Sequence, residues 1–527
     1  MFKFENYFCF LLLILSTSCS ESTYQKKETS QNHQIEITSK NPKAIEFFRK
    51  GEEQKLNNES RESKESFLSA LRLDPNMVMA LIEIPESNLV LRSQYRKKAA
   101  KNIVNANDFE KIYFAWDTLP NNNSAREKKQ ELSKKVIELY PNKIDGYLML
   151  GQSFNPYDEK ESIQGIKSFE KVLEIDPNNV LANSQIIRFN FGGSQNALKL
   201  KNDVDFFKSF DLLAKSTIDR LPNSLRTNLY IGNIYRNSYN FNDEYRIEMA
   251  KKLYDNCLKL VNLNGSSAKV NLIYQLARLN LQMGKIEEAF EMYSSAIDLS
   301  EGNGQKILAN FRMFLAYIYI GDYFSAVKHI NNFEKSLVNS GFTEEEILKC
   351  QVGLNNYKSI IFAHANQKQK ALESLKTYKD FSKQLVAFYG LKENIHSQLI
   401  SYPGPSILRW KEASPRSQLW NEIWVNILVG EHKKAELFQN KFENTFGDRQ
   451  IHWDGILNVL QGNSEKGYSI LRPMTFGYMQ YFKSQALISL GEREKAKKVL
   501  DSVRQLPEGS IFSNLVVKRS SDLYKSL

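Results

Sequence analysis

The sequence is poor in the two residues that most often interrupt a helix. Among 527 residues there are 13 prolines and 24 glycines, and no series of alternating Val, Ile and Thr runs is separated by hairpin turns. Proline and glycine destabilise helix interiors, and alternating runs are the usual mark of half-buried strands. These absences argue against a β-sandwich or barrel and favour a chain that is helical over most of its length.

Motifs for catalysis and for metal binding are missing as well. There is no GxSxG elbow, GxxxxGK phosphate loop or GxGxxG fingerprint, and none of the six histidines lies in an HExxH motif or near a cysteine pair. Ser325 and Lys328 match the SxxK spacing of a serine nucleophile and its lysine base, but this pattern arises easily by chance on a helix. We therefore expect no enzyme activity, no cofactor and no metal site.

The stretch from Asn271 to Leu299 predicts two amphipathic helices joined by a tight turn at Gly284. Ala277 and Ala289, twelve residues apart, leave room for the helices to cross closely. Each helix has one apolar face, and a lone hairpin cannot bury both, so it requires copies stacked on either side. The apolar residues are Leu272, Leu276, Leu279 and Met283 in the first helix, and Ile286, Phe290, Tyr293, Ala296 and Ile297 in the second.

Copies of this spacing recur along the chain, and each ends or turns at a proline or glycine. The pattern resembles the tetratricopeptide repeat (TPR). This resemblance implies an all-α, right-handed superhelical solenoid of about eleven or twelve TPR-like hairpins, and it says little about activity. Two clear copies are Gly51, Ser63, Phe67, Ala70 and Pro75 near the start, and Ser484, Gly491, Ala496, Leu500 and Val503 near the end.

The N-terminus predicts export. Lys3 is followed by an apolar run from Tyr7 to Leu15 that is too short to span a bilayer, and then by small residues before Cys19. This resembles the signal of a bacterial lipoprotein, in which Cys19 would be lipidated and Ser20 would direct sorting to the outer membrane of a Gram-negative-type bacterium. The alternative is an ordinary secretory signal in which Cys19 has no role.

The chain therefore divides into five predicted segments. The first is the signal and the second is a polar, disordered tether. The third and fifth are repeats, and the fourth is a break in which Pro403, Pro405 and Pro415 prevent a regular helix. Their bounds are 1–19 for the signal, 20–41 for the tether, 42–382 for the TPR-like solenoid, 383–416 for the Pro- and Trp-containing break, and 417–527 for the C-terminal hairpins with a capping helix.

After removal of the signal and lipidation of Cys19, Cys257 and Cys350 remain as thiols. Cys257 takes the small-residue position that Ala296 takes in its own hairpin, so we expect it to be buried. The two cysteines lie more than two repeats apart, and neighbouring helices are about 8–10 Å apart, so we expect no disulfide between them.

The net charge of +11 and the pI of about 9.1 would suit nucleic acid in a cytoplasmic protein. Export argues against that partner, and the Lys-Lys pairs are spread over many helices, as solvated faces are. We expect no nucleic acid. An affinity for anionic lipid is compatible with this charge but is unspecific.

Aromatic residues gather at and after the break. Exposed Trp and Tyr suit stacking on sugar rings or capture of a partner segment, whereas buried ones would pack the irregular hairpins, and we favour packing. The candidate aromatic patch comprises Tyr402, Trp410, Trp420 and Trp424, with Trp453 just beyond it.

These features predict a non-catalytic, membrane-anchored scaffold at the cell envelope that binds a protein or peptide in the groove formed by the first helix of each pair. The candidate partner-binding residues are Asn228, Asn310, Arg312 and Asn355, although a residue of this kind on a helix is more often merely a solvated surface residue. The alternative is a glycan-binding outer-membrane lipoprotein that acts with a transporter, as the outer-membrane sugar-capture lipoproteins built from TPR helices do. Only residues 402–424 could supply its aromatic contacts.

Overall fold

The computed structural model describes residues 33–527 apart from 87–88, 121–122, 193, 239–242, 265–267, 340, 389–413 and 448. The predicted signal, Cys19 and residues 20–32 of the predicted tether lie outside this part of the chain. Within it every regular element is a helix, so the all-α prediction is confirmed.

In the described part of the chain twelve helix pairs follow one another, as the repeat spacing predicted. Helix α11 (Ser194–Asn202) separates the members of the fifth pair, and α27 (Ile511–Ser526) follows the last. The pairs are α2 (Pro42–Leu56) with α3 (Ser60–Leu73), α4 (Val78–Glu83) with α5 (Leu89–Asn102), α6 (Asp108–Thr118) with α7 (Asn123–Leu139), α8 (Ile144–Ser153) with α9 (Glu159–Ile175), α10 (Val180–Phe191) with α12 (Val204–Arg220), α13 (Leu225–Asn237) with α14 (Glu244–Asn264), α15 (Ala268–Gln282) with α16 (Ile286–Asp298), α17 (Asn303–Tyr319) with α18 (Tyr323–Leu337), α19 (Glu344–His364) with α20 (Lys368–Phe388), α21 (Pro415–Leu428) with α22 (His432–Phe446), α23 (Ile451–Leu460) with α24 (Ser464–Leu471), and α25 (Gly477–Ser489) with α26 (Arg493–Arg504).

The small residues of the repeat pattern lie where the two helices of a pair touch. Gly51 faces the ring of Phe67, and the buried Ser63 hydroxyl donates to the Gly51 carbonyl at 2.8 Å. The turn between α15 and α16 depends on Gly284, whose φ of +75° lies in the left-handed region that favours glycine. The predicted Asn271–Leu299 hairpin is therefore confirmed together with the reason for its spacing.

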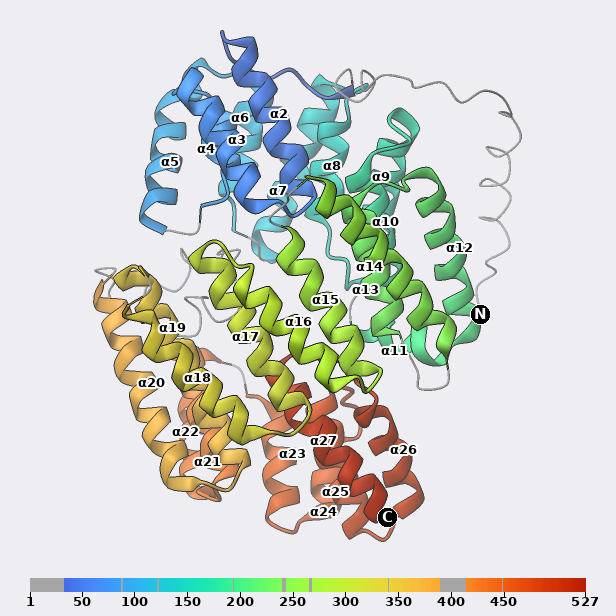
Figure 1. The fold of residues 1–527 in the computed structure, drawn as a ribbon, viewed down its shortest axis with the longest axis vertical. Coiled ribbons are helices and arrows are strands. Elements are labelled where there is room, and N and C mark those ends of the chain that lie inside the picture. Colours follow the sequence, from blue (N-terminus) through green and yellow to red (C-terminus); the bar gives the residue numbers. More distant parts are fainter. Residues whose placement is uncertain are drawn as a thin grey trace.

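The last helix returns to the middle of the solenoid. Figure 1 shows α2–α6 at one end of the long axis, α21–α26 at the other, and α15–α19 between them. Helix α27 packs on α26, as a capping helix would, and it also packs on α17 and α19. Its Ile511 and Leu515 enter the core of α17–α20, whereas Val516 enters the core of the last three hairpins. The predicted capping helix thus joins two parts of the solenoid.

The end of the predicted tether is packed against the first hairpins. Ile35 and Ile37 are buried in the core that α2–α8 share. Residues 33–41 are therefore part of the folded unit, which leaves 20–32 as the segment that could serve as a tether.

No helix in the described ranges combines the length and the apolar character that crossing a membrane requires.

Candidate functional site

Three of the predicted partner-binding residues occupy one repeat position and stabilise their own helices. Asn310 and Asn355 each lie sixteen residues before the packed alanine of the second helix, Ala326 and Ala371. Their side-chain Nδ2 atoms donate to the carbonyls of Lys306 at 2.8 Å and of Gln351 at 2.9 Å, one turn earlier.

Asn228 holds the start of α13 in the same manner. Its Nδ2 donates to the carbonyl of Ser224 at 2.8 Å and to that of Pro222 at 2.9 Å. Because its side chain is fully buried, as that of Asn355 nearly is, these amides are committed to the backbone.

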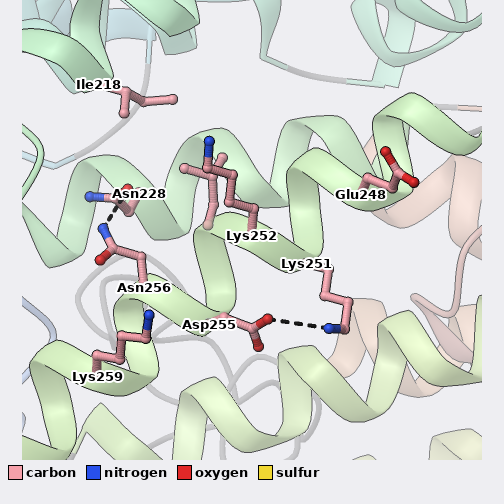
Figure 2. A pocket seen from close by; sticks show the side chains of 9 residues that line it. Ile218, Asn228, Glu248, Lys251, Lys252, Asp255, Asn256 and Lys259 are labelled. Atoms are coloured by element: carbon pink, nitrogen blue, oxygen red, sulfur yellow. Dashed lines mark hydrogen bonds and ion pairs between the residues drawn. The ribbon is translucent and has the colours of Figure 1, made fainter.

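Two hollows open between consecutive second helices. The larger, of about 510 Å³, lies between α12 and α14 over α13. Among its lining residues Asn256 donates to the Asn228 side-chain oxygen at 3.3 Å, and Lys251 pairs with Asp255. Both interactions are drawn as dashed lines in Figure 2. The other, of about 310 Å³, lies between α16 and α18 and includes Asn310. The larger hollow is lined by charges of both signs, whereas the smaller is lined by Lys306 and by no acidic side chain. Neither assembles a catalytic group, so neither defines a ligand chemistry.

The first helices of the central pairs instead hold a segment of the chain itself. We call the side of the solenoid formed by α13, α15, α17 and α19 the first-helix face. The connection between α26 and α27, residues 505–510, lies on this face, and side chains bind its backbone. The Lys201 ammonium donates to the carbonyl of Gln505 at 3.3 Å, and the Tyr319 hydroxyl donates to that of Leu506 at 3.2 Å.

Helix α27 continues the same contact. Asn514 donates to the carbonyl of Leu315 at 2.9 Å, and the Tyr323 hydroxyl donates to that of Leu515 at 3.2 Å. Arg519 donates to the carbonyl of His364. Of these three bonds, the one from Tyr323 is made to the main chain of the segment, as are those from Lys201 and Tyr319. Such bonds bind a segment largely irrespective of its side chains, which is how a peptide groove operates.

Three arginines gather beside this segment. Arg236 and Arg278 both donate to the Gln275 side-chain oxygen, at 2.6 and 3.1 Å. Arg312, the fourth predicted partner-binding residue, lies 5.2 Å from the Tyr274 ring centroid. We call Arg236, Arg278 and Arg312 the arginine cluster.

Glu508 is the carboxylate that contacts this cluster within the described part of the chain. It is 1% exposed and pairs with Arg278, which also donates to the Glu508 carbonyl. Burial lowers the pKa of Arg236 to about 10, with the neighbouring Arg278 charge as a second cause. For Arg278 burial is again the largest effect and acts in the same direction, but the Glu508 charge together with the nearby Tyr293, Tyr254 and Tyr274 outweighs it and raises the pKa.

The N-terminal segment lies on the first hairpins in a similar manner. Its Ile35 amide donates to Asp145 at 2.8 Å, and its Ile35 carbonyl accepts from Arg49 at 2.8 Å. Asn107 donates to the Glu36 carbonyl at 2.7 Å. Burial raises the pKa of Asp145 to about 6 and that of nearby Glu52 to about 7.

The two residues of the predicted aromatic patch that the structure describes, Trp420 and Trp424, belong to the core. Trp424 is 3% exposed, and Trp420 is partly buried with its ring centroid 4.5 Å from that of Trp453. Neither presents an open ring to a sugar. Tyr402 and Trp410 lie outside the described residues.

The cysteines and acids form no further site in the described ranges. Cys257 and Cys350 are free and buried, in different core clusters, and no group of three or more His, Cys, Asp or Glu there could hold a metal ion. Cys257 is fully buried in its core cluster, which confirms the prediction that it packs as a small residue, and this burial raises the pKa of its thiol to about 12.

The sequence interpretation named Arg312 but missed Arg236, Arg278 and Glu508, because it treated charges on helices as solvated. One signal was present in α13, whose sequence is LRTNLYIGNIYRN. Between Arg226 and Arg236 it has no charged residue, whereas a solvated helix face would carry several.

Comparison with known proteins identifies the repeat. A family model described as Tetratricopeptide repeat matches residues 270–303, which cover α15 and α16 and confirm the predicted resemblance for this hairpin. No sequence among the curated proteins matches the chain.

Several solved structures of helical-repeat proteins are similar to it. A monomeric IFIT1 mutant with Gppp-AAAA is 14% identical with a TM-score of 0.35, over 93% of this chain and 90% of that one. The human IFIT1 dimer with m7Gppp-AAAA is 13% identical with a TM-score of 0.32, over 88% and 90%. Naa15/Naa10 bound to HypK-THB is 9% identical with a TM-score of 0.18, over 92% and 79%. The chain is thus an all-α solenoid that contains a tetratricopeptide repeat at residues 270–303.

Proposed function

We propose that this protein is a non-catalytic scaffold that binds a protein partner on its first-helix face. The observation that carries the proposal is the hold on residues 505–510, where Tyr319 of α17 donates to the Leu506 carbonyl and Arg278 of α15 donates to the Glu508 carbonyl. A face that binds main-chain atoms through side chains on separate helices has the chemistry needed to bind a peptide of another protein.

We further propose that the scaffold is anchored at the cell envelope by lipid on Cys19. The support is the N-terminal signal followed by the polar residues 20–32, which would link the anchor to the first hairpins. Metabolic labelling with a palmitate analogue tests the anchor. We expect label and membrane association in the wild type and loss of both in Cys19→Ala, and equal labelling of the two proteins would contradict it.

Site-specific photo-crosslinking in the native cell tests partner binding. One version of the protein carries the photoreactive residue at Arg312, on the first-helix face, and a matched version carries it at Phe324, a 78% exposed position on the second helix α18. We expect crosslinks to another protein from position 312 and far fewer from position 324. Equal crosslinking from both, or crosslinks from 324 alone, would contradict the proposal.

A further inference from the structure

The arginine cluster carries more positive charge than its surroundings balance. Three guanidinium groups on three consecutive first helices face one contacting carboxylate in the described part of the chain, that of Glu508. Arg236 and Glu508 are each 1% exposed. Because an uncompensated charge away from water is costly, such a cluster favours a second anionic group.

Buried polar atoms of the cluster also lack hydrogen bonds. Among the described residues, the Nε atoms of Arg236 and Arg312 and the hydroxyl of fully buried Tyr293 have no hydrogen-bond partner. The charges of all three arginines and of Glu508 act on the Tyr293 hydroxyl, so these groups lie near it. Buried polar groups are almost always paired in a native protein, and unpaired ones indicate a missing partner.

The segment that now lies there has the form of a peptide ligand. Residues 505–510 (QLPEGS) contain no helix, and three of their carbonyls, of Gln505, Leu506 and Glu508, accept from side chains of α11, α17 and α15. The Glu508 side chain enters the cluster, so main-chain contacts and one acidic side chain are recognised together.

We propose that the arginine cluster is a binding site for an extended acidic segment of a protein partner, and that residues 505–510 are an internal ligand which such a segment displaces. This inference rests on the proposed function and specifies the partner's chemistry. In an incoming segment with two neighbouring carboxylates, one carboxylate would pair with Arg278. The other would supply the negative charge that balances Arg236 and Arg312.

A fluorescence anisotropy titration with a labelled peptide of residues 501–514 tests the proposal on the full chain. The Glu508→Gln variant weakens the internal ligand, and Glu494→Gln, an exposed glutamate on α26, is the matched control. We expect the peptide to bind the Glu508→Gln chain at least tenfold more tightly than the wild type or the control. The same peptide with the Glu508→Gln change should bind at least tenfold more weakly.

Equal binding of the two peptides, or no binding of either, would overturn the proposal. Displacement of the labelled peptide by inorganic phosphate as readily as by unlabelled peptide would also overturn it, because the site would then select charge alone.

A second measurement needs no variant. Hydrogen exchange of the wild-type chain should become faster at residues 506–515 on addition of the 501–514 peptide that carries Glu508. The same peptide with the Glu508→Gln change should leave exchange as it is. Unchanged exchange with both peptides would refute displacement. Crosslinking to a partner at position 312 together with failure of the peptide would overturn this inference and leave the proposed function standing. Peptide binding without any crosslinked partner would contradict the proposed function and leave the arginine cluster standing as a site for an acidic peptide.

Discussion

Adding a single methyl group at Gly151 should destabilise the fourth helix pair. A Cβ at this position would lie 2.6 Å from two ring carbons of Phe169, well inside the roughly 3.5–4.0 Å of a normal carbon contact. Phe169 cannot move away easily, because it is fully buried and its ring packs edge-on against Phe189 at 5.4 Å.

The size of the effect follows from two opposing terms. Overpacking a core typically costs about 1–3 kcal/mol, whereas replacing glycine by alanine inside a helix gains up to about 1 kcal/mol. We therefore expect Gly151→Ala to lower the free energy of unfolding by about 1–2 kcal/mol. The matched control is Gly304→Ala in α17, where a Cβ meets no atom within 4 Å, so its effect should be neutral or slightly stabilising.

Urea denaturation followed by far-UV circular dichroism would compare the two variants with the wild type. Because repeats in a solenoid contact mainly their neighbours, hydrogen exchange should place the loss of protection in α8–α10. A Gly151→Ala protein as stable as Gly304→Ala would show that the pair can separate without cost, and would refute the close-contact explanation of the small-residue position.

Three further predictions concern the N-terminal segment and two buried titratable groups. Ile35→Ala should cost about 2–4 kcal/mol in urea denaturation because its side chain is 3% exposed, whereas Glu36→Ala, at an exposed neighbour, should cost little; equal effects would show that this segment is not part of the core. Burial raises the pKa of Glu52 from 4.5 to about 7, so the unfolded chain ionises first and stability should fall as pH rises from about 4.5 to 7; melting temperatures of Glu52→Gln should lack this fall, and an identical pH profile would contradict it. Burial, and then the Arg519 charge, hold the pKa of His364 well below its ordinary 6.5, so the unfolded chain takes up the proton and stability should fall as pH drops below about 6.5; His364→Gln should reduce this acid-side loss, and an unchanged loss would assign it to other groups.

Local spacing was enough to predict the helix pairs. The distance of twelve residues between Gly51 and Ser63, or between Ala277 and Ala289, depends only on helix geometry and on contact within one hairpin. The same logic placed Cys257 in a buried position. It did not identify what the asparagines do, because an amide that caps its own backbone and one that faces a partner have the same spacing.

The aromatic patch shows a second limit of local patterns. Trp420 and Trp424 follow a proline-containing break, where a sequence pattern cannot distinguish an exposed binding ring from one that fills an irregular core. The structure places both against Trp453 or Tyr478, because the C-terminal hairpins meet there. Their surroundings are fixed by contacts between hairpins, which no single repeat contains.

Closure of the solenoid explains why Arg236 and Arg278 escaped the sequence interpretation. The curvature of a solenoid accumulates from small rotations between neighbouring repeats, so contacts such as that between Lys201 and Gln505, 304 residues apart, depend on every intervening loop. An arginine on a first helix is solvated in an open array and becomes buried only when a distant segment covers it. The contact between Arg278 and Glu508 therefore depends on the closure of the solenoid and not on the spacing within either repeat. The Arg278–Glu508 pair that shields the cluster from solvent is also the pair that a competing acidic segment must replace. The strength of this pair therefore sets the affinity that a partner segment needs in order to bind.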